Sequence, residues 1–259
     1  MFERNTCIVI ALNVKSPKQR DSDFHWITIA NKPNKILDIL NATAAIQGVN
    51  LVVLGQQFQN VSEPWLRSAN CHLGFKLLEI NNFVKSDTVK PDDIVLITEA
   101  FDVVLVGDID TVIKRYVAMN VPVVFGAENG CWPITPLCDQ LPFKGSPTRG
   151  LNSGTILGRA KYFRSLMADY VFDEGFDDQR YCMGKYIAHP DVIGLDHDRQ
   201  LFLTLSWMSE DARNDMSWSL DGVFRWKDKT PPFVHRCGES KEWLDKSIKY
   251  LYEKYARLA

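Results

Sequence analysis

The feature that most constrains the fold is a regular alternation between short apolar, β-branched runs and segments whose apolar residues recur at helical spacing. The strand-like runs are residues 7–12, 51–54, 94–98, 121–125 and 155–158. The helical segments are residues 35–47, 72–84, 111–119, 159–171 and 179–188. This order predicts an α/β fold with a mostly parallel central sheet and helices on both faces. Because no repeat, linker or low-complexity tract interrupts it, we expect residues 1–259 to form a single domain.

Composition narrows the partners of such a domain. The 259 residues are 46% hydrophobic, which is enough for a large buried core. The 30 Lys and Arg residues nearly balance the 32 Asp and Glu residues, and no long basic block occurs. We therefore expect no nucleic-acid partner and no anionic membrane surface. No apolar segment approaches the roughly 18 residues of a membrane span, so we also expect none.

The cysteines and the N-terminal segment bear on the compartment. Six cysteines are scattered without any Cys-x-x-Cys pair. The apolar run at residues 7–12 is too short for the core of a signal peptide, and Asn13 ends it. We therefore predict mostly free thiols and a cytoplasmic protein. The even number of cysteines leaves a disulfide framework open as the alternative.

Carboxylates are concentrated in the stretch "IVLITEAFDVVLVGDID", residues 94–110. Glu99 and Asp102 follow a fully apolar run at the carboxyl end of a predicted central strand. Carboxylates in such a place need a cation, several amide donors or a raised pKa. A divalent metal is the most economical partner, and a pair of acids that caps a turn is the alternative.

Asp108 and Asp110 stand where the next predicted helix begins. An aspartate at that position satisfies free backbone amides, so we interpret both residues as helix caps. The same stretch, "VLVGDIDTV", also resembles the nucleophile motif of haloacid-dehalogenase-like phosphatases. That alternative makes Asp108 the nucleophile and Asp110 the acid.

The stretch "FVHRCGESKEW", residues 233–243, carries the second group of candidate ligands. Imidazole, here His235, binds divalent transition metals well. Gly238 lets the backbone approach an anion closely, and Lys241 supplies a positive charge. Together these residues suit a metal-bound diphosphate, although a lone histidine after a strand can also be a packed structural residue.

Six motifs in order connect these features to a known family. They are "TEAFDVVL", "VVFGAENGCWP", "LNSGTILG", "FDDQRYC", "LDHDRQLF" and "FVHRCGESK". In this order they resemble the glycosyltransferase domain of procollagen lysyl hydroxylases and related collagen glycosyltransferases. The tail "HRCGESKEW" is also similar to the end of glycogenin-like transferases. The resemblance covers about residues 51–243 and implies a Rossmann-like GT-A domain that binds a UDP-sugar through Mn²⁺, with Mg²⁺ as an alternative.

The resemblance implies roles for residues at the metal and the nucleotide. Asp102 and His235 correspond to metal ligands of the family. Glu99 replaces the first aspartate of the family motif, so we expect it to be a third ligand or to contact the ribose. Gly74 and Lys76 resemble the Gly-x-Lys that meets the nucleotide.

Other residues are implied at the donor sugar. Asn152, Ser153 and Gly154 match a family turn near that sugar. Asp177 and Asp178 match essential aspartates of the family and are our catalytic candidates, with Asp178 the stronger.

Three further residues complete the implied site. Trp132 is expected to stack on a sugar face, and Gly238 and Lys241 are expected to hold the diphosphate. We expect the long loop at residues 131–150 to cover the site, and His197 to serve local structure only.

The resulting prediction is a hexosyltransferase of glycan biosynthesis. It would move galactose or glucose from UDP-galactose or UDP-glucose to a hydroxyl of a glycan or glycoprotein acceptor. The alternatives are the phosphatase that uses Asp108 and a non-catalytic domain that binds a UDP-sugar or a glycan.

Overall fold

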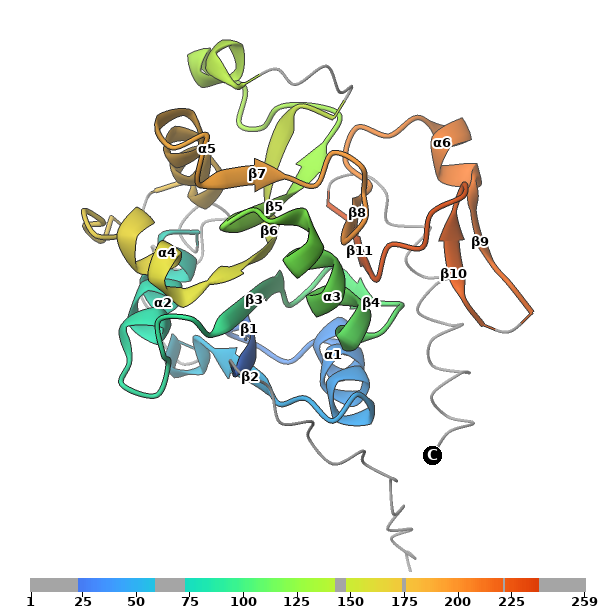
Figure 1. Ribbon diagram of the computed structural model, residues 1–259, viewed down its shortest axis with the longest axis horizontal. Coiled ribbons are helices and arrows are strands. Elements are labelled where there is room, and N and C mark those ends of the chain that lie inside the picture. The colour runs from blue at the N-terminus through green and yellow to red at the C-terminus, as the bar shows by residue number, and fades with distance from the viewer. Residues whose placement is uncertain (1–22, 59–72, 143–147, 174–175, 221, 238–259) are drawn as a thin grey trace, which may run out of the picture.

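A six-stranded sheet forms the centre of the molecule (Figure 1). The computed structural model describes residues 23–58, 73–142, 148–173, 176–220 and 222–237. The strand order is β2-β1-β3-β6-β5-β7. The strands are β1 (Phe24–Ile29), β2 (Leu51–Leu54), β3 (Ile94–Glu99), β5 (Val123–Glu128), β6 (Gly150–Arg159) and β7 (Ile193–Leu195). Only β6 runs antiparallel to its neighbours, which confirms the mostly parallel sheet.

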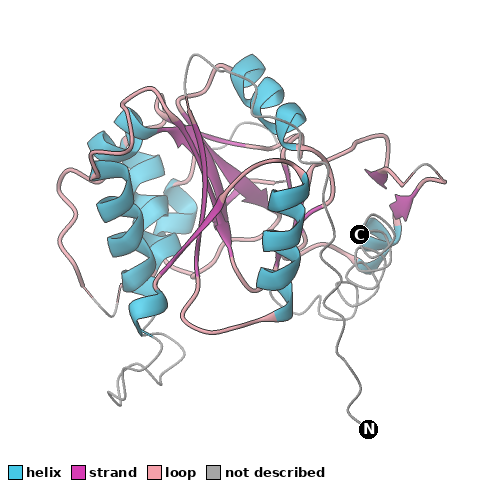
Figure 2. Ribbon diagram, turned by 90° about the horizontal axis from the view of Figure 1, so that it is seen from below, coloured by secondary structure: helices cyan, strands magenta, loops and turns pink. Residues whose placement is uncertain are grey.

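Helices cover both faces of this sheet, as Figure 2 shows. One face packs against α1 (Lys35–Ile46) and α3 (Ile109–Met119). The other packs against α2 (Leu73–Lys85), α4 (Ala160–Leu166) and α5 (Asp178–Ala188). The predicted α/β architecture is therefore confirmed.

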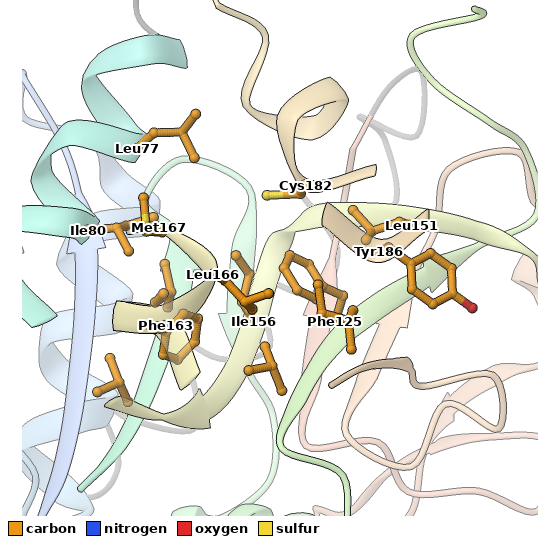
Figure 3. Packing of buried hydrophobic residues seen from close by; sticks show 14 of the residues in the cluster. Leu77, Ile80, Phe125, Leu151, Ile156, Phe163, Leu166, Met167, Cys182 and Tyr186 are labelled. Atoms are coloured by element: carbon orange, nitrogen blue, oxygen red, sulfur yellow. The ribbon is translucent and has the colours of Figure 1, made fainter. Parts of the chain in front are cut away.

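Two hydrophobic clusters lie on opposite faces of the sheet because successive strand residues point in opposite directions. In β1, Trp26 belongs to the cluster under α1 and α3, whereas Ile27 belongs to the cluster under α2, α4 and α5. In β3, Leu96 and Val95 divide in the same way. Figure 3 shows part of the cluster under α2, α4 and α5, in which side chains from these three helices meet the strands. This two-sided burial fixes the register of the sheet and thereby the position of its strand ends.

A second, three-stranded sheet pairs the last strand of the described chain with a strand from the middle of the sequence. Its order is β4-β11-β8, with β4 at Val103–Leu105, β11 at Phe233–His235 and β8 at Phe202–Thr204. A small outer unit follows β8 and contains α6 (Glu210–Asn214), β9 (Met216–Trp218) and β10 (Phe224–Trp226). A third hydrophobic cluster joins this unit to β4, β8, β11 and α1.

The predicted elements differ from the structure at their ends, and the short strands β4, β7, β8, β9 and β10 were not predicted. The helix predicted at residues 159–171 is shorter, since α4 ends at Leu166. Strand β1 was missed, because its polar residues break the apolar pattern. Thr28 donates its hydroxyl to the carbonyl of Thr98, and Trp26 Nε1 donates to Thr98 Oγ1, so these buried polar groups are paired. The predicted strand at residues 7–12 lies outside the described residues.

The prediction of free thiols was wrong for two cysteines. Cys131 and Cys138 form a disulfide, with their Cα atoms 6.0 Å apart. The 3₁₀ helix η3 (Pro136–Gln140) folds the intervening chain back and so brings the two cysteines together. Cys182 and Cys237 keep unoxidised thiols, in agreement with the prediction.

The segment predicted as a loop at residues 131–150 is therefore interrupted by η3 and the disulfide, and its last residue begins β6. Another short 3₁₀ helix, η1 (Gln56–Phe58), follows β2. Among the helices in the described part of the chain, none has the length and apolar character needed to cross a membrane.

Candidate functional site

Two acids and one imidazole converge where the two sheets meet. Glu99 ends β3, and Asp102 lies in the turn that leads to β4. Strand β11 pairs antiparallel with β4, so that His235 lies opposite Val103, and the backbone N–H of residue 236 donates to Asp102 O at 2.8 Å. His235 Nε2 is consequently 3.2 Å from Glu99 Oε2 and 3.4 Å from Asp102 Oδ1. The structure thus brings together residues separated by more than 130 positions.

The electrostatics of this cluster fit a divalent cation. One ligand atom from each of Glu99, Asp102 and His235 lies within 4.8 Å of the other two. Burial would raise the pKa of Glu99, but Lys76 and His235 outweigh it and hold that pKa well below its usual value. Burial raises the pKa of Asp102, and the opposing interaction with His235 offsets this rise only in part. A set of two carboxylates and one imidazole is a donor set that Mn²⁺ and related divalent metals accept.

Gly154 makes room for the imidazole. A Cβ atom at this position would lie 2.1 Å from His235 Cε1, which no real structure tolerates. The side chain of Asn152 accepts a hydrogen bond from the N–H of Gly154 at 2.9 Å and so fixes the turn. The Asn-Ser-Gly motif, predicted near the donor sugar, therefore packs against His235. We call Glu99, Asp102 and His235 the metal cluster, because they are the candidate metal ligands.

Lys76 links the cluster to a further acid. Its Nζ atom lies 2.9 Å from Glu99 Oε1, 2.7 Å from Asp178 Oδ2 and 3.0 Å from the carbonyl oxygen of Ser153. Burial alone would lower the pKa of Lys76, but the carboxylates of Asp178 and Glu99 outweigh it and raise that pKa above its ordinary value. The ammonium is thus a fixed positive charge between two carboxylates. The expected contact of Lys76 with the nucleotide stays a prediction.

The two catalytic candidates occupy different environments. Asp177 is the N-cap of α5, and its side chain accepts from Arg180 N at 2.8 Å. Asp178 is buried, with 3% of its surface exposed, and it faces Lys76. Asp177 therefore caps α5, whereas Asp178 lies beside Lys76 and Glu99. Gly74 is also placed by the fold, because its carbonyl accepts from the Tyr170 hydroxyl at 2.9 Å.

The sequence analysis missed Glu128, which ends β5 and is 1% exposed. Asn152 Nδ2 donates to one of its oxygens at 3.0 Å, and Gln179 Nε2 donates to the other at 3.3 Å. Burial raises the pKa of Glu128 despite these hydrogen bonds. Its position at the carboxyl end of a parallel strand, like that of Glu99, was the signal that could have found it.

A cavity of about 600 Å³ opens above Glu128, Asn152 and Gln179. Trp132 lines it, and the carbonyl of Trp132 accepts from Gln179 Nε2 at 2.7 Å. Cys237, two residues after His235, lines the same cavity and receives a contact from Asn152 Nδ2 at 3.6 Å. The cavity therefore adjoins the metal cluster.

Several candidates lie away from the site or outside the described residues. Asp108 is exposed and caps α3, accepting from Thr111 N at 2.7 Å, while Asp110 lies in the first turn of that helix. His197 Nδ1 lies 2.5 Å from the carbonyl oxygen of Thr148 and serves local structure, as expected. Gly238 and Lys241 belong to a segment outside the described residues, so their roles stay predictions.

Comparison with known families matches residues 20–258 to the family described as the PLOD GT domain. The chain is 26% identical to a procollagen-lysine,2-oxoglutarate 5-dioxygenase of Drosophila melanogaster, over 96% of this chain and 36% of the relative. It is also 26% identical to the human multifunctional procollagen lysine hydroxylase and glycosyltransferase LH3, over 67% of this chain and 26% of the relative. The chain thus spans about a third or less of the length of these relatives.

Among solved structures, the crystal structure of mouse xyloside xylosyltransferase 1 in its apo form matches 83% of this chain and 98% of that chain. The identity is 10% and the TM-score is 0.47. This likeness is too weak to bear on the fold or the function.

Proposed function

Because the chain belongs to the PLOD GT domain family, we propose that it is a metal-dependent hexosyltransferase. It would transfer galactose or glucose from a UDP-sugar to a hydroxyl of a glycan or glycoprotein, with residues 1–259 acting as one nucleotide-sugar-dependent domain. The observation that carries this proposal is the convergence of Asp102, His235 and Glu99 at the end of the central strand β3. Galactose or glucose as the transferred sugar rests on the resemblance of the motifs.

Asp102, His235 and Glu99 would hold the metal, which we propose to be Mn²⁺ with Mg²⁺ as an alternative. When bound, such a cation neutralises the negative charge that develops on a departing diphosphate. Gly154 and Asn152 support this function indirectly, because they hold the imidazole of His235 in place. We also propose that Gly238 and Lys241 contact the diphosphate.

Lys76 and Asp178 would act on the sugar side of the cluster. The buried ammonium of Lys76 lies between the carboxylates of Glu99 and Asp178, and it helps to hold the pKa of Glu99 well below its usual value. We propose that Asp178 orients the sugar hydroxyls or takes the acceptor proton. Asp177 would contribute by fixing the start of α5, and Ser153 by its carbonyl contact to Lys76.

The cellular location stays a prediction. A disulfide such as that between Cys131 and Cys138 is typical of oxidising compartments. It therefore counts against the cytoplasmic location expected from the sequence.

A donor screen tests the proposal. UDP release is measured over several UDP-sugars, with and without Mn²⁺, for the wild type and for Asp102→Ala. We expect metal-dependent release from UDP-galactose or UDP-glucose that the substitution abolishes. UDP binding without turnover would instead support the non-catalytic alternative. Hydrolysis of an aryl phosphate that Asp108→Asn abolishes would support the phosphatase, which the capping role of Asp108 already disfavours.

A further inference from the structure

Two exposed tryptophans from distant parts of the chain line the cavity beside the metal cluster. Trp132 follows β5, and Trp207 follows β8. Each has 56% of its surface exposed, although large aromatic side chains are usually well covered. The exposed ring surface at this cavity is therefore in need of an explanation.

Trp207 is held in place by several contacts. Its φ of 58° lies in the left-handed region, which is unfavourable for a bulky residue and costs about 1–3 kcal/mol. Its ring lies against Gly130, where a Cβ atom would approach Trp207 Cδ1 to 2.3 Å. Its carbonyl accepts from Asn129 Nδ2 at 3.4 Å, and Asn129 is itself held by Arg199 at 2.6 Å. A strained residue that is fixed in this way indicates a functional position.

The cavity combines aromatic walls with a polar floor. Glu128, Asn152 and Gln179 are buried on the floor and hydrogen-bond to one another, and their side-chain oxygens have lone pairs for further hydrogen bonds. Arg213 lines the cavity from α6 and supplies further donors. A pyranose ring presents an apolar face for stacking on an aromatic ring and hydroxyls for such a floor.

The cavity adjoins the proposed donor groups, but its lining differs from the proposed metal ligands and Lys76. All of its lining residues belong to the chain from Glu128 onward, and Glu99, Asp102 and Lys76 are not among those that the structure describes as lining it. We propose that this cavity is the acceptor subsite, that it receives a pyranose ring of a glycan, and that Trp207 determines acceptor specificity. This inference rests on the proposed function, because an acceptor requires a transferase.

The experiment compares two activities of the same protein. UDP release without acceptor reports the donor site, and transfer to p-nitrophenyl β-galactoside, β-glucoside and β-xyloside reports the acceptor subsite. We expect Trp207→Ala to raise the KM for the preferred glycoside at least roughly tenfold and to leave acceptor-free UDP release unchanged. Trp207→Gly should behave alike while it relieves the backbone strain, which separates loss of the ring from misfolding. Leu220→Ala is the control, because Leu220 is fully exposed and does not line the cavity.

Two results would overturn the inference. One is an unchanged acceptor KM in both Trp207 variants. The other is transfer to a hydroxylysine peptide but to none of the glycosides. A wild type that releases no UDP from any donor would refute the proposed function instead. In that case, binding of the same glycosides is measured by saturation-transfer NMR, and the absence of any Trp207-dependent signal overturns the subsite as well.

Discussion

The two ends of strand β3 carry similar side chains with different surroundings. At the amino end, His25 Nε2 lies 2.9 Å from Asp93 Oδ2. At the carboxyl end, His235 Nε2 lies 3.2 Å from Glu99 and 3.4 Å from Asp102. Both ends therefore pair an imidazole with carboxylate, and residue type alone does not tell them apart.

Backbone amides make the difference. Asp93 accepts hydrogen bonds from the N–H groups of Asp23, at 3.1 Å, and Lys90, at 2.8 Å, in addition to its contact with His25. Within the described residues, no backbone N–H donates to Glu99 or Asp102. In the described part of the chain, the groups that compensate these carboxylates are the side chains of Lys76 and His235. The comparison teaches that a buried carboxylate served by amides is a structural residue, whereas one without them retains free lone pairs for a metal.

The largest expected effect tests the carboxyl end. Asp102→Ala or His235→Ala should reduce Mn²⁺-dependent UDP release by roughly a thousandfold, because each removes a metal ligand. Adding EDTA to the wild type should have the same effect, and excess Mn²⁺ should reverse it. If activity survives both the substitution and the chelator, the carboxyl end of β3 holds no functional metal. Its carboxylates would then not differ in role from Asp93 at the amino end.

The next effect sharpens the comparison through a residue that binds no metal itself. Gly154→Ala should push the His235 ring away and lower metal-dependent UDP release by roughly a hundredfold, with a stability loss of about 1–3 kcal/mol. Titration of Mn²⁺ binding should show a weakened site.

Gly184→Ala is the matched control for that substitution. A Cβ atom at Gly184 would meet nothing within 4 Å, and the residue lies inside α5. It should raise the free energy of unfolding by about 0.5–1 kcal/mol with no loss of activity. Equal activity in the two variants would show that the packing of His235 on residue 154 is irrelevant to function.

The sequence could predict part of this site. Asp102 could be predicted as a site residue because it follows an apolar strand, and His235 because it ends one. Their contact depends on the pairing of β4 with β11, which joins distant segments and leaves no local pattern. The structural role of Asp93 was equally hidden, since its amide donors come from residues 23 and 90.

The five helices α1 to α5 and four strands of the central sheet, β2, β3, β5 and β6, were predictable from periodicity, whereas the missed features depend on tertiary partners. Strand β1 has buried polar residues that only Thr98 of the adjacent strand satisfies. The ion pairs of Lys76 with Glu99 and Asp178 were not predictable, because neither carboxylate partner is adjacent in sequence. The disulfide likewise required η3, which the loop composition did not reveal.

The amino end should respond in stability instead of activity. Asp93→Asn should cost about 1–3 kcal/mol of unfolding free energy and leave UDP release unchanged, because it weakens the contacts to His25 and the two amides. Burial would raise the pKa of Asp93, but these hydrogen bonds outweigh it and lower that pKa. The wild-type contribution is thus complete above the ordinary aspartate pKa of about 3.9 and is lost as the pH falls through the lower folded-state value. Urea unfolding between neutral and acidic pH should show the two proteins converging as the pH falls, and a constant difference would contradict the assignment.

The smallest effect concerns Asp108, a third kind of carboxylate in the same stretch of sequence. It is exposed and accepts from both the N–H and the hydroxyl of Thr111, so its charge already serves the start of α3. Asp108→Ala should lower the unfolding free energy by about 1 kcal/mol and leave UDP release at the wild-type level. Asp108→Asn should have a smaller effect still, because asparagine is also a good N-cap. Since neither variant touches the metal cluster, a large loss of activity in Asp108→Asn with intact folding would show that the chemistry lies at α3 and not at the carboxyl end of β3.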